Sequence, residues 1–153
     1  LVQQVGPPYL VANTEAWINS PAGQKSRQQM DGFPVSLETG KENLLAAYHH
    51  GVMLVTGSDA GTLLVFHGPT VEHEVELWVW AGIPAHVALQ AATYNAARLL
   101  RADGHIGSIR KGNDADLMLV DGNPLQDISA IERISAVYFK GEHIDRSAVL
   151  NPE

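Results

Sequence analysis

The residue best suited to chemistry in this chain is Asp59, in the segment Thr56-Gly57-Ser58-Asp59-Ala60-Gly61. Glycine lets a backbone turn sharply and approach a ligand closely, so Gly57 and Gly61 can hold the carboxylate at the end of the preceding apolar run. A carboxylate in such a place can bind a divalent metal or accept a proton from water. The alternative is structural, because Gly, Ser and Asp are also common turn residues and Asp59 could simply cap the turn.

Two histidines follow Asp59 closely. His67 lies on the expected loop, and His73 lies in the first turn of a helix that we expect to begin at Pro69 or Thr70. A histidine at either place could hydrogen-bond a carboxylate or carbonyl of a substrate. The alternative for both is a hydrogen bond that anchors the loop, and a direct role in metal binding is less favoured than either.

The elements that must position Asp59 are a strand and the helix before it. Residues 52–56 are apolar and β-branched and lie between Gly51 and Gly57, which predicts a short strand buried on both faces. Residues 37–50 carry an apolar stripe that predicts a helix ending at Gly51. A helix followed by a strand is one step of a parallel α/β sheet, where chemistry lies at the C-terminal ends of the strands.

The rest of the chain is expected to form the scaffold. Helices are predicted at residues 85–92 and 94–100, the second capped by Thr93, and strands at residues 9–12, 106–109, 115–120, 136–139 and 142–144. Lys140-Gly141 predicts a tight hairpin turn between the last two strands. Asp116 lies between apolar residues and is expected to hydrogen-bond nearby backbone rather than to do chemistry.

Composition argues against several classes of protein. The 153 residues carry a formal net charge of −7, whereas nucleic acids and anionic membranes need clustered Lys and Arg, so we expect neither as a partner. No cysteine is present, which excludes disulfides and thiolate metal sites and is compatible with the cytoplasmic location that we expect. No apolar run approaches the roughly 18 residues that cross a bilayer.

Six blocks follow one another along the chain in a fixed order. They are Thr56–Gly61, His67-Gly68, His73–Leu77, Ala81–Ile83, Ala88–Thr93 and Gly107–Leu117. In order and spacing they resemble the C-terminal part of the amidohydrolase superfamily, particularly its imidazolonepropionase-like and prolidase-like members. Several blocks in register are much harder to obtain by chance than one motif.

The resemblance implies an α/β fold made of two parts. Residues 1–104 would be the last portion of a TIM-type (β/α)8 barrel, with its closing strand near residues 52–56. Residues 105–153 would supply short strands of a small composite β-sandwich domain. A complete barrel takes roughly 250 residues or more, so we expect the chain to be a fragment of a longer enzyme.

The resemblance also implies a reaction and gives Asp59 two roles in it. In the family the matching aspartate binds a divalent metal ion, with zinc as the first choice, and handles the proton of the attacking water. The implied reaction is hydrolysis of a carbon–nitrogen bond in a small-molecule substrate such as a cyclic amide, an imidazolone or a dipeptide. A catalytic metal needs about three protein ligands, and the family draws the others from segments absent here, so we expect this chain alone to be inactive.

Two functions of other classes stay open. The chain could be a non-catalytic structural module that self-associates as a homo-oligomer through exposed barrel or sheet edges. It could also be a small metal-binding protein, because Asp59, His67 and His73 are suitable ligand types, although no helical or hairpin spacing brings them together.

Overall fold

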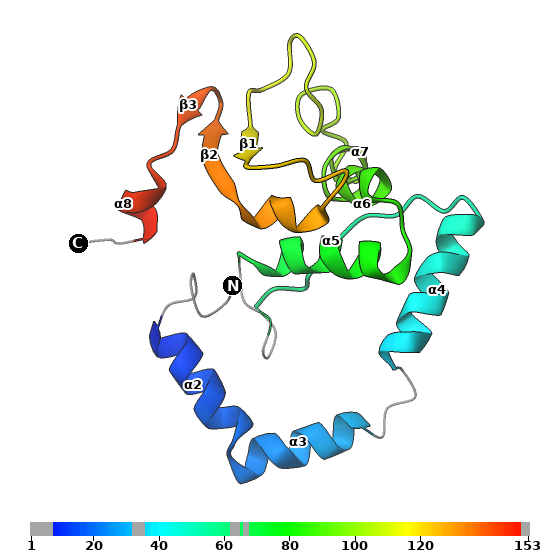
Figure 1. The fold of residues 1–153 in the computed structure, drawn as a ribbon, viewed down its shortest axis with the longest axis vertical. Coiled ribbons are helices and arrows are strands. Elements are labelled where there is room, and N and C mark those ends of the chain that lie inside the picture. The colour runs from blue at the N-terminus through cyan, green and yellow to red at the C-terminus, as the bar shows by residue number, and fades with distance from the viewer. Residues whose placement is uncertain (1–7, 32–35, 62–64, 66–67, 151–153) are drawn as a thin grey trace.

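The computed structural model describes residues 8–31, 36–61, 65 and 68–150, which form a mixture of helices and strands (Figure 1). The helices are α2 (Pro8–Ile18), α3 (Pro21–Asp31), α4 (Leu37–His49), α5 (Thr70–Ala81), α6 (Ala85–Ala92), α7 (Tyr94–Leu99), the 3₁₀ helix η1 (Ile128–Glu132) and α8 (Arg146–Leu150). The strands β1 (Leu117–Val120), β2 (Ile134–Phe139) and β3 (Glu142–His143) form one sheet in that order.

Helices α2 and α3 meet at a corner and lie apart from the sheet in Figure 1. The Ser20 hydroxyl donates to the Trp17 carbonyl oxygen at 2.6 Å and accepts from the Gly23 amide at 3.1 Å. A Cβ on Gly23 would lie 2.1 Å from that same carbonyl oxygen, so the close approach requires glycine. The strand predicted at residues 9–12 is wrong, because these residues belong to α2. A four-residue apolar run does not distinguish strand from helix, and Pro8 is well suited to a first helical position.

Helix α4 begins where the sequence predicts. The Ser36 side chain caps it by accepting a hydrogen bond from the Thr39 amide at 3.1 Å. Half-buried Leu44, Leu45 and Tyr48 pack from α4 against the core. The predicted apolar stripe therefore does face the interior.

The core lies where α5, α6 and η1 meet. Its buried members are Val75, Ile83, Ala88 and Ile131. Gly82 ends α5 in the left-handed conformation, with φ of 110°, and the Ile83 amide returns to the Trp78 carbonyl oxygen at 3.0 Å. This turn places the Ile83 side chain in the core.

Helices α5, α6 and α7 confirm the predicted helices, with one local difference. Thr93 precedes α7 but makes no capping hydrogen bond with its side chain. Its hydroxyl instead donates backwards to the Leu89 carbonyl oxygen at 2.7 Å. The side chain therefore closes the end of α6 rather than the start of α7.

Helix η1 is not anticipated by the sequence interpretation. Asp127 accepts hydrogen bonds from the Ser129 amide at 3.1 Å and from its hydroxyl at 2.7 Å. The hydroxyl contact, followed by that of Arg133, lowers the pKa of Asp127 below its ordinary value. The Asp-Ile-Ser sequence is a recognisable side-chain turn, and it directs buried Ala130 and Ile131 toward α5.

The sheet confirms the predicted hairpin. Strands β2 and β3 are antiparallel, and the turn between them has positive φ at Lys140 (50°) and Gly141 (84°), as a type I′ turn requires. The Asp116 carboxylate accepts a hydrogen bond from the Lys140 amide at 2.7 Å. The structural role expected for Asp116 is therefore confirmed.

The strand predicted at residues 106–109 is wrong, because these residues form turns. Gly107 has φ of 81°, and a Cβ there would lie 2.5 Å from the Ala97 Cβ. The glycine allows the chain to pass directly over α7, which a strand with side chains on both faces could not do.

The predicted strand at residues 52–56 is also not formed. The described strands pair only with one another, and Val52 and Met53 are 56% and 45% exposed. A strand of a parallel sheet needs neighbours for its backbone groups, and no described strand lies beside this segment. Leu54 alone of these residues packs against the core cluster.

Truncation of Ile83 tests the position of the core. Ile83 is 1% exposed, so Ile83→Ala should lower the free energy of unfolding by about 2–5 kcal/mol. Ile109→Ala is the matched control, because Ile109 is 90% exposed and its truncation should change that free energy by no more than about 0.5 kcal/mol. Urea denaturation of both variants measures the difference, and equal losses would contradict this core.

Candidate functional site

Asp59 lies in the irregular segment that follows residues 52–56. Its φ is 52°, a left-handed conformation that residues other than glycine seldom adopt, although Asp tolerates it better than most. Two residues after Asp59, the Gly61 amide donates to the Val65 carbonyl oxygen at 3.0 Å. The structure thus places Asp59, which is exposed, on a constrained backbone.

Two helices hold the segment that leads to Asp59. The Gly57 amide donates to both carboxylate oxygens of Glu74 in α5, at 3.1 and 2.9 Å. The Asn95 side-chain amide in α7 donates to the Leu54 carbonyl oxygen at 2.9 Å. Side chains from the helices therefore satisfy backbone groups that the strands of a sheet would otherwise satisfy.

An open cavity of about 370 Å³ lies beside Gly57 and Ser58, just before Asp59. Its lining residues are Gly57, Ser58, Val65, Thr70, His73, Glu74 and Leu77. The His73 side chain is 67% exposed, and its Nδ1 lies 3.7 Å from a Glu76 carboxylate oxygen. His73 thus lies at the cavity, where it could meet a ligand, whereas His67 lies outside the described residues.

The described residues do not make a complete metal site. Within residues 8–31, 36–61, 65 and 68–150, no group of three or more His, Asp or Glu side chains is placed to hold a metal ion. A catalytic zinc ion needs about three protein ligands. Asp59 is therefore at most a single ligand within this part of the chain.

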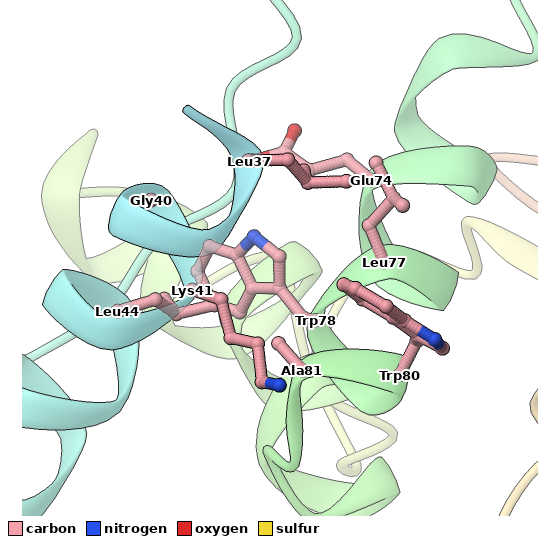
Figure 2. Close-up of a pocket in the computed structure, with 9 residues that line it drawn as sticks. All are labelled: Leu37, Gly40, Lys41, Leu44, Glu74, Leu77, Trp78, Trp80 and Ala81. Carbon is pink, nitrogen blue, oxygen red and sulfur yellow. The ribbon is translucent and has the colours of Figure 1, made fainter. Parts of the chain in front are cut away.

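A second cavity, of about 220 Å³, lies between α4 and α5 (Figure 2). Lys41 and Trp80 lie at one end of it, with the Lys41 ammonium 5.3 Å from the centre of a Trp80 ring, and Leu37 and Glu74 lie at the other. Its lining is mainly apolar. Glu74 and Leu77 line both cavities, so α5 forms a shared wall between them.

Sequence reasoning missed Glu74 and Asn95 as parts of this site. Glu74 lies in the block His73–Leu77, but it is one of three carboxylates at alternate positions of α5, with Glu72 just before the block and Glu76 within it. Spacing alone does not tell which of the three turns toward residue 57. Asn95 lies 41 residues from its partner, so no local pattern reveals the contact.

No helix in the described part of the chain has the length and apolar character needed to cross a membrane.

The sequence pattern of the Amidohydrolase family matches residues 16–144. Adenine deaminase 2 of Jannaschia sp. (strain CCS1) is 30% identical over 126 residues, which are 80% of this chain and 20% of that protein. The chain therefore spans about a fifth of the length of this curated relative. The resemblance stated from the six blocks is confirmed at the level of the superfamily.

Solved structures agree with this match. A Xaa-Pro dipeptidase with bound methionine in its active site is 38% identical, with a TM-score of 0.63 over 68% of this chain and 25% of that chain. Molinate hydrolase is 24% identical, with a TM-score of 0.68 over 92% of this chain and 32% of that chain, a similarity that concerns the fold alone.

Two substitutions at Asp59 test its backbone conformation. A β-branched residue is poorly suited to positive φ and glycine is well suited, so Asp59→Val should be less stable than Asp59→Gly by about 1–2 kcal/mol. Thermal and urea unfolding of the two variants measure this difference. Equal stability would show that residue 59 does not keep its left-handed conformation in solution.

Proposed function

This chain belongs to the amidohydrolase family, and from that premise we propose that it forms part of an enzyme that hydrolyses carbon–nitrogen bonds in small molecules, with Asp59 as a catalytic carboxylate. The observation that carries the proposal is the placement of Asp59, in a left-handed conformation, next to Ser58, which lines an open cavity. Side chains of two helices hold the backbone of the preceding residues, Glu74 at Gly57 and Asn95 at Leu54. A group held in this way is preorganised for reaction.

Asp59 would act as a base and then as an acid. Its carboxylate accepts a proton from the attacking water as the water oxygen bonds to the carbon, and it returns the proton to the nitrogen that leaves. In the complete enzyme a divalent metal, with zinc as the first choice, would lower the pKa of that water, and Asp59 would be one of its ligands. The described residues do not hold such an ion by themselves.

The substrate would be a small molecule with a susceptible carbon–nitrogen bond, such as a cyclic amide, an imidazolone or a dipeptide. The relatives support two more specific classes of substrate, because one relative is named as an adenine deaminase and another as a Xaa-Pro dipeptidase. His73 lies at the cavity and would donate a hydrogen bond to a carboxylate or carbonyl of the substrate. His67 is proposed for the same kind of contact.

The proposed domain organisation follows the family. In the complete enzyme, residues 1–104 would be the last part of a TIM-type barrel that closes near residues 52–56, where the strand absent from this chain would form beside neighbouring strands, and residues 105–153 would contribute to a small β-sandwich. The antiparallel sheet β1-β2-β3 is compatible with the second part. A cytoplasmic location also remains a prediction.

Substitution of Asp59 tests the proposed reaction. Asp59→Asn keeps the shape of the side chain but removes its basicity, so kcat should fall by about 10²-fold or more. The assay uses the complete enzyme that contains residues 1–153, with ammonia release from adenine and amino-acid release from Xaa-Pro dipeptides as readouts. Glu42→Gln is the control, because Glu42 is an exposed carboxylate on α4 away from the turn.

The two variants together decide the assignment. Retention of kcat in Asp59→Asn would exclude Asp59 as the base. An equal loss in Glu42→Gln would show that the effect is one of charge or folding rather than of chemistry.

A second candidate function is a non-catalytic module that self-associates. It is favoured by the large apolar side chains that the described residues expose, among them Val52, Met53, Trp80, Met118 and Leu119. Apolar surface of this kind often marks an interface, and homo-oligomerisation would cover it.

Light scattering tests the self-associating module. A homo-oligomer would give a mass that is a multiple of 16.5 kDa, and Met118→Lys on the edge strand β1 should shift it toward the monomer because a charged edge opposes pairing. A monomeric mass at every concentration tested would rule this candidate out.

A further inference from the structure

We propose that Glu74 is a positioning residue, which holds the backbone of Gly57 so that Asp59 keeps its left-handed conformation beside the cavity. The inference rests on the proposed function only in taking Asp59 as the reacting carboxylate. The contact between Glu74 and Gly57, and its effect on residue 59, can be tested without any assay of activity.

The contact is made through the backbone of Gly57. Its amide donates to both carboxylate oxygens of Glu74, at 3.1 and 2.9 Å, across 17 residues of sequence. Hydrogen bonds to an ionised acceptor are stronger than those between neutral groups. A Cβ on Gly57 would meet nothing within 4 Å, so that side of the residue is open and the amide contact lies elsewhere on its backbone.

Asp59 needs such a contact because of its conformation. A residue other than glycine stays at positive φ only where its surroundings over-determine the backbone. Before Asp59, the Asn95 side-chain amide donates to the Leu54 carbonyl oxygen at 2.9 Å, and after it the Gly61 amide donates to the Val65 carbonyl oxygen at 3.0 Å. Glu74 acts between these two points, two residues before Asp59.

The neighbouring carboxylates of α5 do not share this role. Glu76 lies 3.7 Å from the His73 imidazole, and a buried carboxylate oxygen of Glu72 has no hydrogen-bond partner. Glu76→Gln is therefore a matched control for Glu74→Gln, because both variants lose one negative charge from the same helix.

Nuclear magnetic resonance of the 153-residue chain tests the proposal. In the unmutated protein the Gly57 amide proton should show a nuclear Overhauser effect to the Glu74 γ protons. In Glu74→Gln the exchange of that amide with solvent should accelerate about tenfold, because the acceptor loses its charge, and the backbone ¹³C resonances of Asp59 should move. Both should stay unchanged in Glu76→Gln.

Each outcome decides the proposal. Absence of the Overhauser effect in the unmutated chain would overturn it even if Glu74→Gln failed to fold. Faster exchange of the Gly57 amide in Glu74→Gln without a shift of the Asp59 resonances would also overturn it. So would equal changes in Glu74→Gln and Glu76→Gln.

Kinetic measurements on the complete enzyme distinguish the positioning role of Glu74 from the proposed catalytic role of Asp59. Glu74→Gln should lower kcat about tenfold with little change in KM, whereas Glu42→Gln, at an exposed carboxylate of α4, should keep kcat. If Asp59→Asn retains activity while the resonances behave as expected, the proposed function fails and the positioning contact stands.

Discussion

A residue other than glycine in the left-handed conformation, such as Asp59, has to be held there by its surroundings, because its own local energy opposes that geometry. In this chain two side chains do this. The Glu74 carboxylate accepts a hydrogen bond from the Gly57 amide, and the Asn95 side chain donates one to the Leu54 carbonyl oxygen. The segment between them has no described neighbouring strand. These hydrogen bonds therefore decide where Asp59 lies.

The hydrogen bonds depend in turn on the packing of the helices. Glu74 precedes Val75, a buried member of the core cluster, so the side of α5 that packs inward also sets the direction of Glu74. Ile83 enters the core through the turn that ends α5, and Ile131 reaches it from η1. Core packing, helix orientation and the position of the carboxylate are thus linked in one chain of contacts.

The sequence predicted what depends on local patterns. Helices with clear caps and apolar stripes, such as the one after Ser36, and the Lys140-Gly141 hairpin are specified within a few residues. The strand prediction at residues 9–12 is wrong because a short apolar run fits a strand and a helix equally well. The strand prediction at residues 106–109 is wrong because Gly107 lets the chain pass close to Ala97. The partners of Gly57 and Leu54 lie 17 and 41 residues away, beyond any local pattern.

Hydrogen exchange along residues 52–61, followed by mass spectrometry, tests most directly the claim that this segment is fixed by its helices. We expect slow exchange at Gly57 and Gly61, whose amides donate to Glu74 and to the Val65 carbonyl oxygen, with protection approaching that of α5. Exchange of the whole segment at the rate of an unstructured peptide, while α5 stays protected, would contradict this claim, because Asp59 would then have no fixed place near the cavity.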